Sequence, residues 1–451
     1  MRFDDTIFAL ATAPGKAAVA IVRVSGGGAA EAVCRLSGEA LPAPRQAAVR
    51  CLRQPESGDE IDRALVLWFP GPNSYSGEDV AEFHLHGGRA VVSALLDALG
   101  GMAGFRPAEA GEFSRRAFEH GKLDLTAAEG IADLVDAETD VQRRQALRQS
   151  GGALAALYDG WRQRLLDNRA LVEASIDFSD QELPSDLLGP GQQEISAIAA
   201  EISRHLQDGG WGERLREGIQ IAILGPANAG KSSLLNCLAG RDAAIVGPEG
   251  GTTRDIIEVR MDLGGWPLSI ADSAGLRAVS DQVEAEGIRR AHKLAAEADL
   301  KLVLFDGALW PDIAGEAIAE KAVGLLDDTA LAVLNKSDLL PGEAEAARIG
   351  GCEALQISCK TGAGLDSLLE RIKLFLEARY RPSASPVITR ARHRHALKKC
   401  LAALERYDID AGSELAAEEL RLAADALGRI TGRVDIENLL DIIFHDFCIG
   451  K

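Results

Sequence analysis

The sequence predicts a protein of mixed fold class in three parts, and three observations support this. Short apolar runs separated by Gly and Pro turns fill residues 1–119, as in an α+β domain. Residues 120–213 and 381–451 share an Ala-, Leu- and Glu-rich helical pattern typical of an all-α domain. Residues 214–380 alternate strand-like and helical stretches in the βαβ manner. We therefore expect an α/β domain inserted between two halves of a helical domain.

The composition fits a multidomain protein. A chain of 451 residues is long enough for two or three domains of about 100 to 200 residues. The formal net charge of −19 argues against indiscriminate binding to phosphate backbones or anionic membranes. Seven cysteines without metal-like spacing predict free thiols in a reducing compartment. An acidic start unlike a signal peptide, and no apolar run long enough for a membrane span, predict a cytoplasmic protein.

Individual segments carry further expectations. Strands are expected over AVAIVRVS, RALVLWFPG and VAEFHLHGG. Helical spacing predicts that Leu154, Leu157, Trp161 and Leu165 form one packing face.

Two polar patterns leave alternatives open. His84 and His86 share a strand face, which suggests either a metal pair or, preferably, a half-buried face. The basic stretch 388–399 is either a solvated helix start, the favoured interpretation, or a contact to nucleic-acid phosphates.

A phosphate-binding loop is predicted from Gly225 to Ser232, where G-x-x-x-x-G-K-S follows the strand-like run IQIAIL and opens a helix. Glycines let backbone N–H groups close around a phosphate, and the helix adds its positive N-terminus. We expect Lys231 to reach the β and γ phosphates and Ser232 to ligate Mg²⁺.

Later motifs predict that the nucleotide is GTP. Asp272 ends an apolar strand where it can hold a magnesium-bound water, and the N–H of Gly275 can touch a γ-phosphate. In NKSD, the Asp338 carboxylate can accept two guanine donors that adenine lacks. SCKTGAG from Ser358 completes the base pocket.

The residue that orients the attacking water is not obvious. Leu276 stands where Ras-like enzymes carry a glutamine, and an apolar side chain cannot position water. Hydrolysis therefore needs help from outside or from other groups. The candidates near this position are Thr252, Thr253, Arg254, Asp255 and Glu284.

Over nearly its whole length the sequence resembles the MnmE (TrmE) family of tRNA modification GTPases. The matching stretches are TIFALATAPG, VAIVRVSG, WFPGPNSYSGEDVAEFHLHGG, GEFSRRAF, KLDLTAAEGIADLVDA, VEASIDF, GTTRD, the GTPase motifs and the terminal FCIGK. The resemblance implies an N-terminal domain similar to folate-binding domains, which forms a homodimer, a helical domain, and an inserted Ras-like P-loop GTPase domain.

The resemblance also implies site residues. The nucleotide positions are Asn228, Ala229, Gly230, Lys231, Ser232, Ser233, Gly247, Thr252, Thr253, Asp272, Gly275, Asn335, Lys336, Asp338, Ser358, Cys359 and Lys360. Mg²⁺ is expected at Ser232 and Thr253, and Glu284 is expected to orient water while Lys231 binds the phosphates. An activating K⁺ is expected at Asn228, Gly247, Glu249 and Thr252.

This sequence departs from the family pattern in three motifs. Pro226 and Ala227 replace the usual order before the asparagine, and Ser273 gives DSAG in place of DTAG. Gly247 and Pro248 replace a threonine and an aspartate in the potassium loop, where Pro248 fixes φ.

The C-terminus is the last expected site. The resemblance implies that FCIGK reaches a folate site formed by Arg23, Glu82, Lys122 and Lys451, which would take 5-formyl- or methylene-tetrahydrofolate. The cations suit glutamate carboxylates, and Glu82 suits the donors of a pterin ring. Cys448 is either a nucleophile with a lowered pKa, which we favour, or a packing residue near the one-carbon unit.

Two functions are compatible with these motifs. In the first, the protein hydrolyses GTP and, in a heterotetramer with an MnmG (GidA)-type FAD protein, adds a carboxymethylaminomethyl or aminomethyl group to C5 of the wobble uridine of certain tRNAs. In the second, it is a GTPase switch in ribosome assembly similar to Era and Der. That second class shares the GTPase domain and does not need Arg23, Glu82, Lys122 and Lys451.

Overall fold

The structure, a computed structural model, describes residues 5–177, 189–208, 210–241, 244–245, 258–272, 293–310, 322–340, 347–380, 386–434, 437–445 and 447–450. The chain divides into two compact units. The first comprises Met1–Val135, Leu147–Ile202 and His395–Lys451, and the second comprises Asp136–Ala146 and Ser203–Arg394. Over the described ranges no helix combines the length and the apolar character that a membrane crossing requires.

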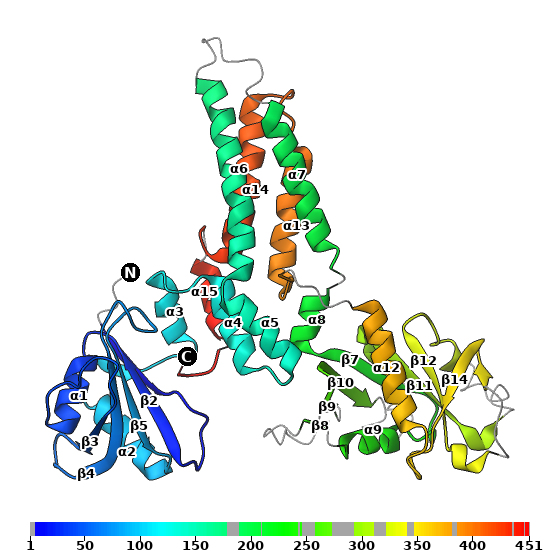
Figure 1. Ribbon diagram of the computed structural model, residues 1–451, viewed down its shortest axis with the longest axis horizontal. Coiled ribbons are helices and arrows are strands. Elements are labelled where there is room, and N and C mark those ends of the chain that lie inside the picture. The colour runs from blue at the N-terminus through cyan, green and yellow to red at the C-terminus, as the bar shows by residue number, and fades with distance from the viewer. Residues whose placement is uncertain are drawn as a thin grey trace, which may run out of the picture. The chain divides into compact units, whose positions relative to one another are not determined.

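A six-stranded sheet with strand order β3-β4-β5-β2-β1-β6 forms the N-terminal part of the first unit (Figure 1). Its neighbours are antiparallel except for β1 and β6, which are parallel. The elements are β1 (Thr6–Leu10), β2 (Val19–Ser25), α1 (Ala29–Ser37), β3 (Ala48–Arg53), β4 (Glu60–Phe69), β5 (Val80–His86), α2 (Arg89–Gly100), β6 (Phe105–Pro107), α3 (Glu112–Glu119) and α4 (Leu125–Val135).

The two faces of this sheet have different roles, and β2 shows why. Val22 and Val24 are fully buried in a core that α1 and α2 complete with residues such as Leu36 and Leu99. Because side chains alternate along a strand, Arg23 lies on the opposite face. The cross-strand partner of Arg23 is Glu82 on β5, so two charged residues meet on the face away from this core.

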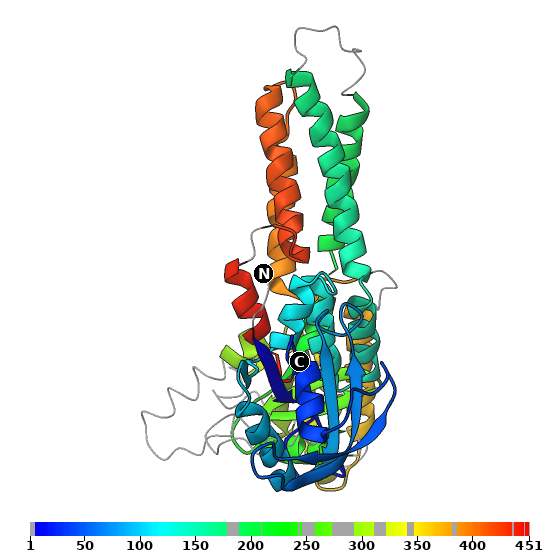
Figure 2. The same ribbon diagram turned by 90° about the vertical axis from the view of Figure 1, so that its left-hand side faces the viewer.

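Four long helices run side by side in the helical part, as Figures 1 and 2 show. They are α6 (Ala153–Asp177), α7 (Gly189–Leu206), α13 (Ala391–Arg406) and α14 (Ser413–Thr431). The predicted apolar face of α6 is confirmed, since Leu154, Trp161 and Leu165 are buried. Tyr158 is buried in place of the half-buried Leu157.

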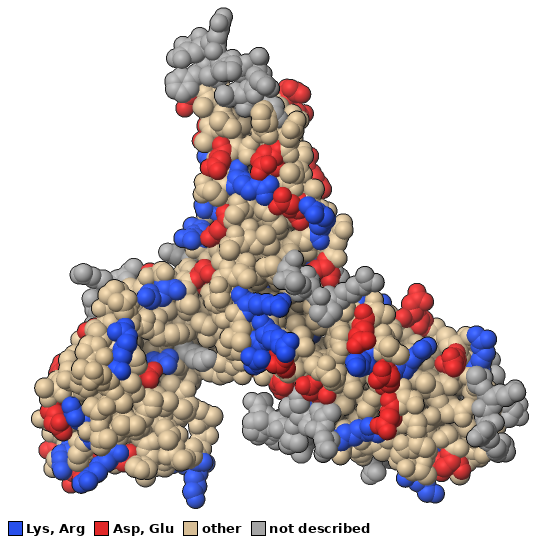
Figure 3. Space-filling view, viewed as in Figure 1, with Lys and Arg blue, Asp and Glu red and all other residues tan. Residues whose placement is uncertain are grey.

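Polar contacts fix the register of these helices. Arg164 on α6 pairs with Glu194 at 2.5 Å and with Glu201 at 2.8 Å, both on α7. Arg406 on α13 pairs with Glu419 on α14 at 2.7 Å. Acidic and basic side chains are accordingly interspersed on the face of the helices drawn in Figure 3.

The last helix anchors the C-terminal tail. Phe444 and Phe447, at and after the end of α15 (Glu437–His445), pack with Leu125 and Ala128 of α4. Their rings lie 5.2 Å apart, centroid to centroid. Because both aromatic side chains are buried, they fix the position of the chain just before its last residues.

The second unit contains an eight-stranded sheet in the order β13-β14-β12-β11-β7-β10-β9-β8. The five central strands, β14 to β10, are parallel, and β8, β9 and β13 are antiparallel additions. The elements are α5 (Asp140–Ser150), α8 (Trp211–Glu217), β7 (Ile219–Leu224), α9 (Lys231–Ala239), β8 (Ala244–Ile245), β9 (Glu258–Leu263), β10 (Trp266–Asp272), β11 (Leu300–Asp306), β12 (Ala330–Asn335), β13 (Arg348–Ile349), β14 (Cys352–Gln356) and α12 (Leu365–Arg379).

Strand order places a binding site at the end of β7. The chain passes from β7 to β10 on one side and then to β11 on the other, so the direction of winding reverses at β7. In open α/β sheets, ligands bind at the carboxyl ends of the strands at such a reversal. One core contains apolar residues of α9 and α12 together with β7, which fixes these helices on one face of the sheet. The predicted inserted α/β domain is confirmed.

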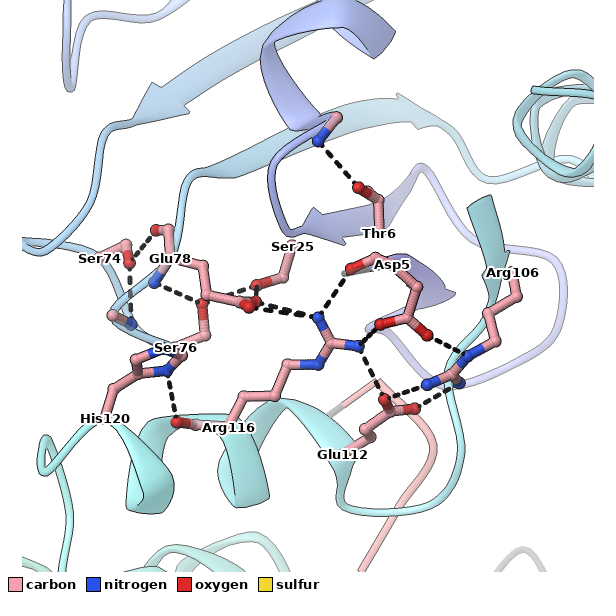
Figure 4. A network of polar contacts seen from close by, with 12 residues as sticks. Asp5, Thr6, Ser25, Ser74, Ser76, Glu78, Arg106, Glu112, Arg116 and His120 are labelled. Atoms are coloured by element: carbon pink, nitrogen blue, oxygen red, sulfur yellow. Dashed lines mark hydrogen bonds and ion pairs between the residues drawn. The ribbon is translucent and has the colours of Figure 1, made fainter. Parts of the chain in front are cut away.

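A buried arginine holds the N-terminal part together (Figure 4). The side chain of Arg116 on α3 is 0% exposed and contacts three carboxylates: Asp5 at 2.7 Å, Glu112 at 3.0 Å and Glu78 at 3.2 Å. Arg106 also pairs with Asp5 and Glu112, both at 2.6 Å. These contacts join the start of β1, the loop before β5 and α3.

Burial alone would raise the pKa of Asp5 and Glu112, but hydrogen bonds and positive charge from Arg106 and Arg116 outweigh it. The pKa of each carboxyl is therefore lowered from its ordinary value, which is 3.8 for Asp5 and 4.5 for Glu112. The network contributes stability above these ordinary values and loses it as the pH falls through the lowered ones.

Replacing Arg116 should destabilise the fold strongly. Arg116→Met removes the fully buried charge and takes away the ion-pair partner of Glu78, which is 11% exposed, while Asp5 and Glu112 keep Arg106; we expect a cost of about 3–5 kcal/mol of unfolding free energy. The neighbouring Arg115 is a matched control, because its pairs with Glu119 and Asp441 involve a side chain that is 34% exposed. Arg115→Ala should cost at most about 1 kcal/mol.

The measurement is urea denaturation of both variants and wild type. The deficit of Arg116→Met should shrink as the pH is lowered through the native titration of Asp5 and Glu112, since protonated carboxyls no longer need the cation. Similar stabilities for the two arginine variants at neutral pH would contradict the role assigned to Arg116.

Candidate nucleotide site and tail site

The phosphate-binding loop lies between β7 and α9 and needs its glycines. Gly225 has φ 137°, and a Cβ there would lie 2.2 Å from the carbonyl oxygen of Leu304. Gly230 has φ 97°, and its Cβ would lie 2.1 Å from Nδ2 of Asn335. Side chains are excluded at both positions by space as well as by backbone conformation.

Lys231 begins α9 with a side chain folded over this loop. Its Nζ donates to the carbonyl oxygens of Gly225 at 3.0 Å and Pro226 at 2.8 Å, and the residue is 8% exposed. Burial lowers the pKa of Lys231, and the negative charge of Asp272 opposes that shift. An ammonium group beside a helix N-terminus is the arrangement that binds nucleotide phosphates.

Ser232, a predicted magnesium ligand on α9, lies beside Asp272, which was expected to hold a magnesium-bound water. Ser232 Oγ donates to Oδ2 of Asp272 at 2.6 Å, and Asp272 is 3% exposed at the end of β10, next to β7. Hydroxyl and carboxylate oxygens are ligands that Mg²⁺ prefers, and the neighbouring lysine supplies the phosphate contact that such sites share. These residues therefore fit a magnesium ion bound together with a nucleotide.

The base-binding residues are also brought together. Asn335 ends β12, donates from Nδ2 to the Ala229 carbonyl at 2.8 Å and accepts from the Cys359 N–H at 3.2 Å. Asp338 accepts from Ser358 Oγ at 2.6 Å, and this hydrogen bond is the largest cause of the lowered pKa of Asp338. The carboxylate is thus kept ionised, as acceptance from two guanine donors requires.

Lys336 has a partner that the sequence analysis missed. It adopts φ 63° and pairs with Asp306 at the end of β11, at 2.5 Å. Two further nucleotide positions, Ser233 on α9 and Lys360, are exposed.

Several predicted residues lie outside the described residues. They are Gly247, Pro248, Glu249, Thr252, Thr253, Arg254, Asp255, Ser273, Gly275, Leu276, Glu284 and Lys451. The expected contacts of Glu284, Thr253 and the potassium loop therefore remain predictions, whereas Asn228 is described and adopts φ 63° in the phosphate loop.

The C-terminal tail lies against the charged face of the N-terminal sheet. Nε and Nη2 of Arg23 donate to Oε1 of Glu82 at 3.0 and 2.9 Å, and Nη1 donates to the Gly450 carbonyl at 3.4 Å. Ile449 forms a bridge with Ala110. Arg23 on β2 thereby links the neighbouring strand β5 to the C-terminal tail.

Two aromatic rings complete this tail site, and the sequence analysis missed both. The guanidinium of Arg23 lies 5.2 Å from the ring centroid of Tyr75 and 5.7 Å from that of Phe113. Tyr75 OH and Ser114 Oγ are 2.7 Å apart. Tyr75 could have been singled out from the sequence, because it is an aromatic residue in the turn-rich stretch PNSYSGED.

The other tail-site candidates differ in their surroundings. Lys122 is exposed and donates from Nζ to the Pro72 carbonyl at 3.0 Å. Cys448 is exposed, and its carbonyl accepts from the Gly111 N–H at 3.5 Å. All seven cysteines are free thiols, as predicted.

The two ambiguous polar patterns have specific partners. His84 contacts Glu82 at 3.4 Å and His86 contacts Asp62 at 2.8 Å, and no group of three potential metal ligands occurs over the described ranges. In the basic stretch, Arg394 pairs with Asp208 at 2.7 Å and Glu213 at 2.9 Å. Its guanidinium is thus held by acidic neighbours, while Lys398 and Lys399 are exposed.

Comparison with known proteins gives matches along nearly the whole sequence. The family model described as MnmE helical domain matches residues 125–448, and that described as GTP-binding protein TrmE N-terminus matches residues 6–122. The tRNA modification GTPase MnmE of Paramagnetospirillum magneticum is 54% identical over 448 residues, which cover 99% of this chain and 100% of that protein. For MnmE of Parvibaculum lavamentivorans the identity is 52% over 451 residues, with coverages of 99% and 100%.

A eukaryotic protein is also similar. The mitochondrial 5-taurinomethyluridine-[tRNA] synthase subunit GTPB3 of Danio rerio is 47% identical over 470 residues, covering 99% of this chain and 93% of that protein. Among solved structures, Era in complex with MgGDPNP and a segment of 16S ribosomal RNA matches 41% of this chain and 65% of that chain, at 23% identity and a TM-score of 0.28. On the family models and the near full-length identities, this chain belongs to the MnmE (TrmE) family of tRNA modification GTPases.

Proposed function

We propose that this GTPase, with an FAD-containing partner of the MnmG (GidA) type, installs a carboxymethylaminomethyl or aminomethyl group at C5 of the wobble uridine of certain tRNAs. The observation that carries the proposal is the tail site. Arg23, Glu82 and the Gly450 carbonyl meet on the sheet of a chain whose described residues also include the phosphate loop, Asp272 and the predicted guanine-binding residues. A protein that acts only as a GTPase switch needs the GTP-binding motifs and does not need the tail site.

In the proposed GTP site, Lys231 and the α9 N-terminus take the phosphates. Ser232 and Thr253 ligate Mg²⁺, Asp272 holds a magnesium-bound water, and Asp338 accepts from guanine. Magnesium, when bound, neutralises charge on the transferred phosphoryl group. Glu284 is proposed to orient the attacking water, since Leu276 cannot.

Potassium is proposed as the activating cation. The side-chain oxygen of Asn228, with backbone carbonyls at Gly247, Glu249 and Thr252, would hold it beside the phosphates. Asn228 lies in the turn before α9 and adopts φ 63°, a left-handed conformation in which asparagine is enriched.

GTP hydrolysis should be faster in KCl than in NaCl at equal ionic strength, by at least about tenfold, equivalent to about 1.4 kcal/mol of barrier. Asn228→Ala should abolish the difference between the two salts. Asn236→Ala changes an exposed asparagine on helix α9, after the phosphate loop, and should keep the difference. Equal, slow rates for wild type would mean that the loop with Gly247 and Pro248 builds no potassium site.

A one-carbon tetrahydrofolate is the proposed ligand of the tail site. Both Arg23 donors converge on one oxygen of Glu82, while the other oxygen contacts His84 Nε2 at the longer distance of 3.4 Å. That second oxygen suits the donors of a pterin ring, and the aromatic ring of Tyr75 lies 5.2 Å from the Arg23 guanidinium that pairs with Glu82. Lys122 and Lys451 would take the glutamate carboxylates, and Cys448 would be the nucleophile.

Calorimetry with 5-formyl-tetrahydrofolate tests this site. Glu82→Gln should weaken binding about thirtyfold, since losing one partner of the half-buried Arg23–Glu82 charge pair costs about 2 kcal/mol. Removal of the last four residues should abolish binding. Glu60→Gln on β4 is the control, because its ion pairs with Arg53 and Arg63 are exposed, and its affinity should equal that of wild type. Absence of binding to the intact chain would favour the ribosome-assembly alternative.

The N-terminal domain is also the proposed site of dimerisation. We propose that the protein is a cytoplasmic homodimer formed through the N-terminal domains and that the dimer joins two FAD-protein subunits in a heterotetramer. The apolar side chains of Val19, Val49 and Leu65 support the dimer, since they are 52%, 66% and 43% exposed. Val49 and Leu65 are paired across β3 and β4, so they form one patch.

Mass spectrometry of tRNA tests the function as a whole. In a strain lacking the gene, digested tRNA should contain wobble uridines without the C5 group, and the wild-type gene should restore it. Lys231→Ala and Glu82→Gln should each fail to restore it, because they remove phosphate binding and folate binding separately, whereas Glu60→Gln should succeed. Unchanged uridines in the deletion strain, accompanied by a ribosome-assembly defect, would overturn the proposal in favour of the alternative.

A further inference from the structure

Two thiols lie together inside the nucleotide site. Cys237 is on α9, about two turns after Lys231. Cys359 lies between Ser358 and Lys360 in the loop of residues 358–364, which we call the base loop because it carries predicted guanine-binding residues. Cys237 Sγ donates to the Cys359 carbonyl oxygen at 3.3 Å. The sulfur therefore lies within about 6 Å of the Cys359 Cα, because the carbonyl oxygen and Cα are bonded to the same carbon. Both cysteines are partly exposed.

The position of this pair matters more than the contact itself. Helix α9 starts with the phosphate-binding residues Lys231 and Ser232, whereas the N–H of Cys359 donates to Asn335 in the base pocket. A covalent link between the two cysteines would join the phosphate side of the site to the base side. We propose that Cys237 and Cys359 form a reversible disulfide that restrains the base loop and slows nucleotide release.

The chemistry is thiol–disulfide exchange with a low-molecular-weight disulfide such as oxidised glutathione. A thiolate attacks one sulfur of the oxidant, which forms a mixed disulfide and releases one thiol. The second cysteine, after losing its proton to solvent, attacks the protein-bound sulfur and releases the second thiol. Two protein thiols are oxidised and one disulfide molecule is reduced to two thiols.

The surroundings set the order of these steps. Burial, and then the nearby Cys237 thiol, raise the pKa of Cys359 to about 12, so Cys359 stays protonated near neutral pH. Cys237 is therefore the cysteine that attacks first, and closure by Cys359 is the slower step. A mixed disulfide on Cys237 should be detectable before the internal link forms.

A disulfide between Cys237 and Cys359 would fix the arrangement in which these two residues are already in contact. The base loop contains three glycines or alanines after Thr361 and is bounded by Gly364, where a Cβ would lie 2.1 Å from the Gln356 carbonyl. Its own hydrogen bonds, from Ser358 N to Ala363 O and from Gly362 N to Ser358 O, keep it compact. Release of the base requires this loop to move relative to Asn335 and α9, and a disulfide opposes that movement.

The test uses the full-length protein treated with oxidised glutathione. Peptide mass spectrometry after alkylation should identify a Cys237–Cys359 linked peptide, and release of a fluorescent GDP analogue should slow by at least about fivefold, the lower end of typical coupling between sites. Dithiothreitol should restore the original rate. Comparing oxidised and re-reduced wild type needs no variant, so a folding defect cannot imitate the effect.

Two variants complete the design. Cys237→Ser keeps a donor towards the Cys359 carbonyl and should release GDP at the same rate with and without oxidant. Cys352→Ser, on β14 in a different apolar cluster, should respond as wild type does. Absence of the linked peptide, or release slowed by less than fivefold once the link is complete, would overturn the proposal. It rests on nucleotide binding alone, so it stands or falls separately from the folate and wobble-uridine proposals.

Discussion

One buried amide holds the nucleotide site together. Asn335 is 2% exposed, donates to the carbonyl of Ala229 and accepts from the N–H of Cys359. The phosphate loop is separated from this residue by 106 positions in the sequence, so no local structure could set the distance between them. A single side chain with both a donor and an acceptor does so. Gly230 is required because any Cβ there would displace this amide.

In the N-terminal part, charged groups lie close together on the face of the sheet opposite the apolar core. Alternation along β2 puts Val22 and Val24 in the core and Arg23 on the other face. Arg116 then fixes the loop and the helix that supply Tyr75 and Phe113 to Arg23, through Glu78 and Glu112. The fully buried cation is stable there because carboxylates surround it.

Much of this was predictable from the sequence. The three-part fold class is confirmed, and so is the strand, loop and helix around Lys231, because glycine spacing and apolar periodicity are local signals. Tyr75, Phe113 and Asp306 were missed for a physical reason. Periodicity tells which face a residue takes within its own element, but not which residue of another element it will meet.

The basic stretch illustrates the same limit. From the sequence, Arg394 was expected in a solvated helix start or at a tRNA phosphate. Asp208 and Glu213, which precede it by nearly two hundred residues, occupy its guanidinium. Charge clustering along the chain therefore overstated how much of this stretch faces solvent.

The tail site depends on packing that occurs before the tail begins. Phe444 and Phe447 are buried against α4, and a Cβ on Gly111 would lie 2.5 Å from the Phe444 carbonyl. Gly450 has φ 100°, and its Cβ would lie 2.4 Å from the Leu10 carbonyl, so the chain passes β1 at a distance that only glycine permits. The carbonyl that meets Arg23 is placed by these contacts and not by its own hydrogen bond, which is long at 3.4 Å. A change that loosens Phe444 would consequently separate Gly450 from Arg23 without altering either residue.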